Sequence, residues 1–277
     1  MVTVADDGGS SGRLRREFGI LPPGDARNCL VALADPDSPL ARIFQYRFER
    51  GHGLAGHALG NLLIAALTDL EGGFPQALET AAAMLGARGR VLPSTTSDVV
   101  LVGELCEGGQ VAGQAAAANL PLRRVRLEPA DPPAHVPALD AIRAADLVVA
   151  GPGSLFTSLL PNFLVAGVAD ALRQSAATRV YVCNVANQRG ETSGMDAAAH
   201  VRALLDHGLE GCFDVVLVHD TLAFPPPPGI EPVLSTEEAT AEIARLGPRV
   251  LVADLVDRVD SRHHDAVLLG TALREVM

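Results

Sequence analysis

The sequence contains no lysine and no tryptophan, so all 22 of its basic residues are arginine. Without lysine, the chain has no Schiff-base nucleophile, no Walker-A phosphate site and no lysine of the protein-kinase type. Cysteine is scarce as well, because the four cysteines are widely spaced and form no C-x-x-C pair. A zinc or disulfide framework is therefore not expected, and the thiols are expected to be reduced, as in a cytoplasmic protein.

Acidic residues outnumber basic ones, and the net charge at pH 7 is −11. Proteins that bind nucleic acid usually carry a basic surface, so this class is not expected. The chain opens with no basic segment followed by an apolar run, so we predict no signal peptide. Residues 147–169 carry no charge, but glycines and prolines interrupt them. We interpret this stretch as a buried strand, a loop and a helix rather than a membrane span.

The order of apolar patterns predicts an α/β fold with one domain over residues 1–277. A short strand is expected at residues 2–5, and helical spacing follows at residues 25–34, 39–48, 54–70 and 74–85. A β-hairpin is predicted at residues 99–105 and 111–114, and another strand at residues 122–127. Predicted strands at 147–150, 180–184, 215–218 and 250–253 then alternate with predicted helices at 140–145, 155–173, 195–207 and 263–276, the second broken near Pro161. This alternation favours a three-layer, doubly wound, mainly parallel sheet of Rossmann-like type with an inserted hairpin.

The first candidate site follows the first predicted strand, where ligands of parallel sheets usually lie. It consists of Asp6, Asp7, Gly8, Gly9 and Ser10. The glycines let the backbone approach a ligand, and amides and hydroxyls can hold an anion. The two carboxylates suit a hydrated divalent ion, or the donor groups of a sugar or base. The alternative is an aspartate-rich turn that caps a helix.

Two further loops follow predicted strands. A glycine turn leads into a helix at Pro152, Gly153, Ser154 and Thr157. This geometry is a potential anion site, although many such turns bind nothing. After the next strand, polar side chains gather at Asn184, Gln188, Glu191 and Thr192. Amides both donate and accept, which suits a nucleobase edge or sugar hydroxyls; the alternative is a polar loop that ends in a helix cap.

His57 and Asn61 lie on an otherwise apolar predicted helix. A buried polar pair costs stability unless it is satisfied, so these residues either face a ligand or satisfy each other within the core. Arg88 lies in an R-G-R turn. It can pair with a phosphate or remain a solvated turn residue.

Taken together, these segments resemble the gluconeogenesis-factor family, a branch of the 2-phospho-L-lactate transferase (CofD-like) superfamily. The family stretch V-A-D-D-G-G-S-S-G-R-L-R occurs at residues 4–15. The other family stretches are P-P-G-D-x-R-N at 22–28, F-Q-[HY]-R-F at 44–48, G-H-[SA]-L-G-N at 56–61, R-G-x-V-L-P at 88–93, G-P-G-S-L-[YF]-T-S-[IL]-L-P-N at 151–162 and Y-[VI]-C-N-x-x-x-Q-x-G-E-T at 181–192. The match weakens after residue 225, where Arg262 and His263 echo a family R-H-D with His264 in place of the aspartate.

The resemblance implies the three-layer fold of the transferases and the binding of UDP-sugars, notably UDP-N-acetylglucosamine. It implies a role in cell shape and in growth on gluconeogenic carbon sources, with no assigned reaction and no known catalytic residues. Under this hypothesis the first loop lies near phosphate and sugar, the 184–192 loop holds base or ribose, and His57 and Asn61 support the floor. The alternative is a transferase that uses a guanosine diphosphate donor and a divalent metal such as Mg²⁺, held by Asp6 and Asp7. Oligomeric state and protein partners stay open.

Members of this family begin with a further strand and a G-G-G-T-G loop before the strand at which this sequence starts. The resemblance therefore implies that a βα unit of about 30 residues is missing. Either the start site is placed too late, which we favour, or the protein is truncated relative to the family. Without that unit, residues 2–5 are expected to have an unpaired edge and exposed apolar surface.

Overall fold

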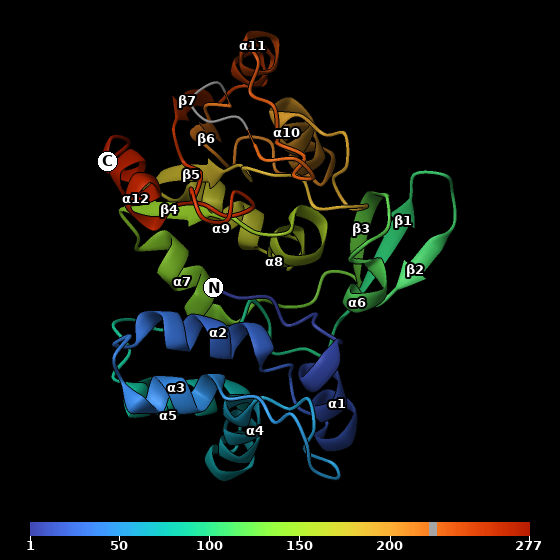
Figure 1. Ribbon diagram of the computed structural model, residues 1–277, viewed down its shortest axis with the longest axis vertical. Helices are drawn as coiled ribbons and strands as arrows, with labels where there is room; N and C mark the ends of the chain where they lie inside the picture. Colours follow the sequence, from blue (N-terminus) through green and yellow to red (C-terminus); the bar gives the residue numbers. More distant parts are fainter. Residues whose placement is uncertain (222–225) are drawn as a thin grey trace.

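The computed structural model describes residues 1–221 and 226–277, and Figure 1 shows two parts joined through a shared core. A group of helices forms one end of the molecule, and a parallel sheet with its own helices forms the other (Figure 1). The N-terminus lies between the two parts (Figure 1). The five helices are α1 (Gly9–Phe18), α2 (Gly24–Leu33), α3 (Pro39–Gln45), α4 (Leu59–Glu71) and α5 (Phe74–Leu85).

Local sequence sets where these helices begin and end. α1 stops at Gly19, whose φ is 66° and whose N–H donates to the carbonyl of Arg15. α5 carries a proline in its first turn and ends at Gly86 with a φ of 61°. A left-handed glycine is the usual helix C-cap, because it has no Cβ to clash with the last turn. The apolar face of α5, including Leu78 and Leu85, is buried against the rest of this end.

The parallel sheet contains β4 (Leu147–Ala150), β5 (Thr178–Val182), β6 (Val215–His219) and β7 (Arg249–Ala253), in that order. Tyr181 and Val216 face a core that includes α9 (Val168–Gln174), α10 (Ala197–Asp206) and α11 (Glu237–Arg245). Val180 and Leu217 face the other side and pack with α12 (Ala266–Arg274). Because neighbouring strand residues point to opposite faces, helices cover both sides of the sheet. The predicted three-layer α/β fold is therefore confirmed.

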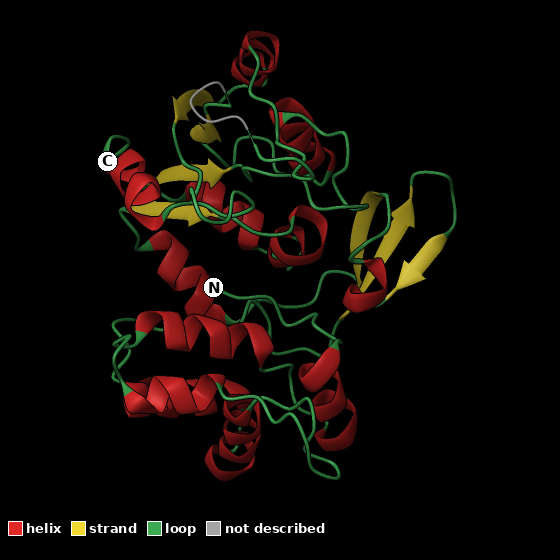
Figure 2. Cartoon of the chain, viewed as in Figure 1, coloured by secondary structure: helices red, strands yellow, loops and turns green. Residues whose placement is uncertain are grey.

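The predicted hairpin is also confirmed, and it belongs to a separate antiparallel sheet of order β2-β1-β3 (Figure 2). Its strands are β1 (Val100–Leu105), β2 (Gln110–Ala112) and β3 (Leu122–Glu128), and the short α6 (Gln114–Ala117) follows β2. Val102 lies opposite Ala112 on one side and Arg126 on the other.

The structure corrects the expectation for residues 2–5. They form no extended strand, only a parallel bridge between Val2 and Pro93. Val2 N donates to Leu92 O at 2.9 Å, and Val2 O accepts from Ser94 N at 2.8 Å. Val2 and Val4 are buried, so the expected exposed apolar surface is absent at these residues. The segment that contains Leu92 therefore pairs with the backbone at Val2, where the resemblance had predicted an unpaired edge.

Other boundaries differ for local reasons. α4 begins at Leu59 rather than at residue 54, because Gly56 adopts a φ of 84° and leaves the chain in a turn. Residues 155–173 divide into the π-helical η1 (Leu155–Leu159), α8 (Leu160–Phe163) and α9, so the break comes after Pro161 rather than at it. α7 (Val136–Arg143) starts earlier than expected, with a proline in its first turn. α11 was not predicted at all, although Thr236 accepts from Ala239 N as its N-cap.

Candidate functional site

A polar cavity of about 1000 Å³ lies outside the carboxyl ends of β4 and β5. This is the edge of a parallel sheet where ligands usually bind. The cavity is lined by the crossover loop after β4, by the loop after β5 and by a segment near the C-terminus. Its polar lining side chains are Asn119, Ser154, Asn184, Asn187, Gln188, Arg189, Glu231, Arg262, His263 and His264.

The crossover loop is shaped by Gly151 and held by Asn184. Gly151 has a φ of 89°, and a Cβ there would lie 2.8 Å from the carbonyl of Val182, so only glycine fits. Asn184 Oδ1 accepts from Gly153 N at 3.1 Å, and its Nδ2 donates to Gly153 O at 2.8 Å. Both ends of this amide are therefore used to hold the loop. Its predicted contact with base or ribose stays a prediction.

Gln188 holds the same loop from the side. Ser154 donates a short hydrogen bond to Gln188 Oε1, and Gln188 Nε2 donates to Ala118 O at 3.0 Å. Thr192 Oγ1 accepts from Gln188 N at 2.9 Å, which closes the turn of the 188–192 loop. The predicted amide residues are thus brought together with Ser154, and they act on the loop backbone.

Glu191 lies beneath the loop and is only 2% exposed. Its carboxylate accepts from Phe156 N at 2.8 Å and from Thr157 Oγ1 at 3.0 Å. Burial raises the pKa of Glu191 above its ordinary value, and these hydrogen bonds partly oppose that rise. The wide π-helical turn of η1 begins at Leu155, immediately before these contacts. Such turns often occur at functional sites, because they reorient backbone groups.

The first loop is a neighbour of this site but does not line the cavity. Asp6 Oδ1 accepts from Gly8 N at 2.9 Å, and Asp7 Oδ1 accepts from Ala115 N at 2.8 Å, at the start of α6. Gln114 on the same helix donates to Thr157 O at 2.8 Å. α6 therefore connects the aspartate loop to the crossover loop. Both aspartates accept from backbone amides, but neither caps α1, whose N-cap Gly8 has no side-chain hydrogen bond. Their predicted ligand contacts stay predictions.

The structure keeps a third group apart. Ser10, His57 and Asn61 are buried together: Ser10 Oγ is 3.0 Å from His57 Nδ1, and Asn61 Nδ2 donates to Ser10 Oγ at 3.0 Å. None of the three lines the polar cavity. The exposed Arg88 follows α5, and its N–H donates to the carbonyl of Leu33 at 2.8 Å. Leu33 ends α2, about 13 Å along that helix from the end that contacts the first loop.

Residues near the C-terminus also line the cavity. In the sequence they were noted only because they partly match a family motif. Arg262 and His263 both lie within ion-pair distance of Asp260, at 2.7 and 3.2 Å. His264 lies 3.1 Å from the carbonyl of Cys183, and burial lowers its pKa to about 4. No strand precedes these residues directly, so the rule that places ligands after strands did not indicate them. Arg189, on the opposite wall, makes no ion pair with any residue of the described ranges.

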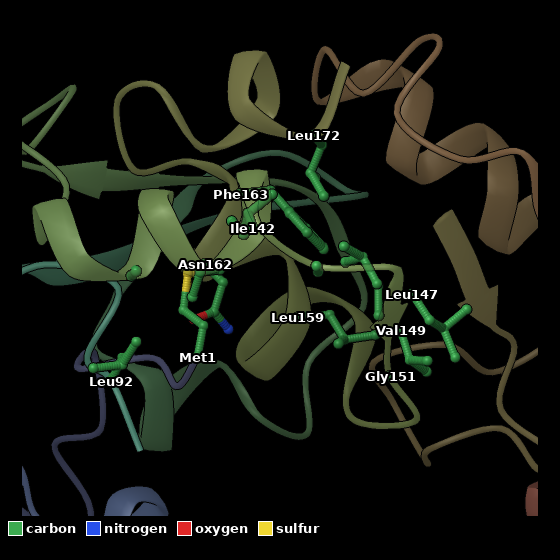
Figure 3. A pocket seen from close by; sticks show the side chains of 15 residues that line it. Met1, Leu92, Ile142, Leu147, Val149, Gly151, Leu159, Asn162, Phe163 and Leu172 are labelled. Carbon is green, nitrogen blue, oxygen red and sulfur yellow. The ribbon is translucent and has the colours of Figure 1, made fainter. Parts of the chain in front are cut away.

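A second cavity has a different character. It occupies about 270 Å³ beside β4 and is lined mainly by aliphatic side chains. Figure 3 shows Met1 beside Asn162, with Leu147 and Val149 on the β4 side. Within the described residues, β4 pairs only with β5, so its other edge faces this apolar cavity. The scarcity of polar groups makes this cavity a poor match for a nucleotide.

The fold and the polar cavity define an α/β protein with a ligand-sized site at the carboxyl edge of a parallel sheet. The family model described as 2-phospho-L-lactate transferase CofD matches residues 1–240, and the chain belongs to this family. Gluconeogenesis factors of Halalkalibacterium halodurans and Bacillus subtilis are 49% and 45% identical over 221 residues, which cover 79% of this chain and 69% and 70% of theirs. The resemblance to gluconeogenesis factors is therefore confirmed.

Solved structures agree with this placement. A crystal structure of a Bacillus halodurans protein superimposes with a TM-score of 0.92 at 42% identity, covering 99% of this chain and 90% of that one. A second crystal structure, of a member of the UPF0052 family from the same organism, gives a TM-score of 0.90. A protein of Nostoc sp. is 46% identical over 284 residues, and the match spans 99% of this chain and 62% of that protein. Among the helices that the structure describes, none is long and apolar enough to cross a membrane.

Proposed function

We propose that this chain is a cytoplasmic regulatory protein that binds a sugar nucleotide of the UDP-N-acetylglucosamine type in the polar cavity. Through this ligand it supports cell shape and growth on gluconeogenic carbon sources. The observation that carries the proposal is the cavity itself, about 1000 Å³ in volume, at the carboxyl edge of the sheet. Small-molecule sites usually occupy about 300–1000 Å³, so the cavity has room for a nucleotide and a sugar together.

The lining chemistry suits a neutral sugar and base joined by an anionic diphosphate. Arg189 supplies positive charge to the cavity, whereas the charge of Arg262 is paired with Asp260. A guanidinium group can donate two parallel hydrogen bonds to two phosphate oxygens. Asn119 presents an amide that both donates and accepts, as hydroxyls and a base edge require. Asn184, Gln188 and Glu191 keep the crossover loop in place beneath the ligand, as their hydrogen bonds to Gly153, Ser154 and Phe156 support.

The alternative function is a 2-phospho-L-lactate transferase-like reaction with a guanosine diphosphate donor and Mg²⁺ at Asp6 and Asp7. Among the described residues, no group of three histidine, cysteine or acidic side chains is placed to hold a metal ion. Asp6 and Asp7 each have one carboxylate oxygen engaged by a backbone N–H. The residues present do not form a complete metal site, so we derive no step through a metal and favour the binding function.

A thermal-shift titration tests the proposal. A ligand at 100 times its Kd stabilises the folded state by about 2.7 kcal/mol, or roughly 5–10 °C in Tm. We expect UDP-N-acetylglucosamine to produce such a shift without added metal. A shift with guanosine diphosphate and Mg²⁺, but with no UDP-sugar, would refute the proposal in favour of the transferase.

Two matched variants localise the ligand. Arg189→Gln removes a cavity arginine that has no ion pair among the described residues, and we expect it to weaken binding at least tenfold. Arg88→Gln removes the same charge from an exposed turn outside the cavity, and it should bind like the parent. Equal effects of the two substitutions would mean that the ligand does not occupy the polar cavity.

A further inference from the structure

Three arginines gather in the helical end of the molecule without an acidic partner. Arg13 lies on α1, Arg27 on α2, and Arg47 follows α3. None of the three forms an ion pair with a residue of the described ranges, in a chain whose net charge is −11. The first-loop, P-P-G-D-x-R-N and F-Q-[HY]-R-F motifs supply these arginines, and the proposed cavity uses none of them.

The loop between α3 and α4 brings two of these guanidinium groups together. It lies beside α1 (Figure 1). Arg47 Nη1 donates to Gly56 O at 2.6 Å, and Arg13 Nη2 donates to Ala55 O at 2.9 Å. A Cβ at Gly56 would lie only 3.1 Å from Arg13 Nη2, so both guanidinium groups lie against the same turn. Each guanidinium donates one of these hydrogen bonds, and a guanidinium has five N–H donors, so further donors remain for a ligand.

The third arginine is buried, and its charge interacts with that of Arg47. Arg27 is 5% exposed; its Nη1 donates to Gln45 at 3.0 Å and its Nη2 to Asn28 at 2.8 Å. Its buried Nε has no hydrogen-bond partner among the described residues. Among the described carboxylates, Asp25 interacts electrostatically with Arg27 and Glu17 with His57, and neither forms an ion pair with it. A buried guanidinium with an unsatisfied donor is costly, so a bound anion would compensate it.

His57 adds another donor. Asn61 Nδ2 is a donor and cannot accept, so Ser10 Oγ accepts from it. The Ser10 hydroxyl proton is then available to His57 Nδ1. This places the imidazole proton on Nε2, for which no described residue serves as acceptor. Burial lowers the pKa of His57, and Arg13 and Arg47 lower it further, in keeping with a positive local field.

We propose that Arg13, Arg47 and His57, backed by Arg27, form a second site that binds a phosphoryl group, separate from the sugar-nucleotide cavity. The site offers N–H donors from three side chains, and no carboxylate of the described residues is in ion-pair contact with them. A phosphoryl dianion has several acceptor oxygens and enough charge to engage two guanidinium forks at once. A monocarboxylate ligand would leave part of this donor set unused.

Histidine-selective ¹⁵N NMR with inorganic phosphate tests the site on the full chain. We expect phosphate to shift the His57 Nε2 resonance, and an equal ionic strength of sodium chloride to leave it in place. The shift should persist when saturating UDP-N-acetylglucosamine occupies the cavity, so failure of one site does not decide the other. Loss of the phosphate effect in the presence of the nucleotide sugar would refute a separate site. A sugar phosphate serves as a second probe, and a response to it alone would assign the site to phosphorylated metabolites.

Variants distinguish binding from loop support. Arg47→Gln should raise the phosphate Kd at least tenfold, and Arg47→Lys should restore part of the affinity because it keeps the charge. Arg42→Gln removes an exposed charge from α3 in the same part of the molecule and should leave the Kd unchanged. Urea unfolding of each variant monitors the fold. An unchanged Kd in a folded Arg47→Gln variant, or the same loss in Arg42→Gln, would overturn the proposal.

Discussion

Asn184 gives the most direct test of how the crossover loop is held. Its side chain makes two hydrogen bonds with the backbone of Gly153, one as acceptor at 3.1 Å and one as donor at 2.8 Å. Asn184→Ala removes both bonds. Asn184→Asp keeps the shape and the acceptor, but it turns the donor into a second acceptor that faces the Gly153 carbonyl.

The magnitude follows from the two bonds. A neutral hydrogen bond contributes about 0.5–1.5 kcal/mol, so two contribute about 1–3 kcal/mol. Gly153 is partly exposed, so water replaces some of this loss, and about 1–1.5 kcal/mol remains. If the ligand needs the loop in place, Asn184→Ala weakens binding roughly fivefold to tenfold. Asn184→Asp adds a negative charge near the diphosphate, which costs about another tenfold at low salt and less as salt screens it.

Calorimetric titration of UDP-N-acetylglucosamine at low and high salt measures both effects. Asn162→Ala is the matched control, because Asn162 also donates to a backbone carbonyl, that of Ser158, but lines the apolar cavity. Urea unfolding shows whether either variant loses global stability. Wild-type affinity in a folded Asn184→Ala variant would show that the ligand does not depend on this brace. If the affinity of the Asn184→Asp variant did not depend on salt concentration, the diphosphate would have to bind elsewhere.

Three further predictions concern stability. Burial lowers the pKa of His264 to about 4, so the folded state disfavours its protonation. This contribution to stability, up to about 3 kcal/mol, is fully present above pH 6.5 and is lost as pH falls toward 4. His264→Gln should therefore weaken the pH dependence of the urea unfolding midpoint between pH 6.5 and 4. Burial and a neighbouring carboxylate raise the pKa of Asp25 to about 6, so its contribution is present below pH 3.8 and lost as pH rises through 6; Asp25→Asn should stabilise the fold by up to about 3 kcal/mol at pH 8 in urea unfolding, and no gain would contradict this. Gly113→Ala should cost about 2–4 kcal/mol because its Cβ would lie 2.2 Å from Asp7 Oδ2, whereas Gly109→Ala has a similar positive φ and an open surround and should cost about 1 kcal/mol in the same assay.

The sequence predicted the layers of the fold because each layer has its own periodicity. Alternating strands and helices after residue 137 indicated parallel pairing, and the four strands lie side by side in chain order. Helix ends were less predictable, because tertiary contacts decide them. α4 starts late because Arg47 and Ala58 pair across a turn, a contact between residues that no local pattern links. α11 was missed although its threonine N-cap and the two glutamates after it are a known helix signal.

The sequence indicated loops that line the cavity because they follow strands, and the ligand contacts predicted for their side chains stay predictions. Asn184 and Gln188 were expected to contact a ligand, and the structure shows both amides engaged with the protein. Residue type and strand position identify a loop. They do not say whether an amide points into a cavity or back at its own backbone. The C-terminal wall, with Arg262 and His264, depends on how the chain returns after β7, which no spacing in the sequence records.

Because the chain has no lysine, its cationic side chains for anion binding are arginines. The pH dependence of anion binding should therefore come from groups other than these cations. Arginine keeps its charge throughout the physiological range, so the guanidinium groups contribute no pH dependence between pH 5 and 8. A sugar nucleotide carries a diphosphate that is substituted at both ends and has no proton to lose in that range. A phosphate monoester loses its second proton near pH 6. The guanidinium groups and the diphosphate therefore add no pH dependence to binding in the polar cavity, whereas binding of a phosphate monoester at Arg13 and Arg47 is expected to strengthen above about pH 6. A sugar nucleotide in the cavity and a phosphate monoester at the second site can therefore be told apart by the pH dependence of their binding.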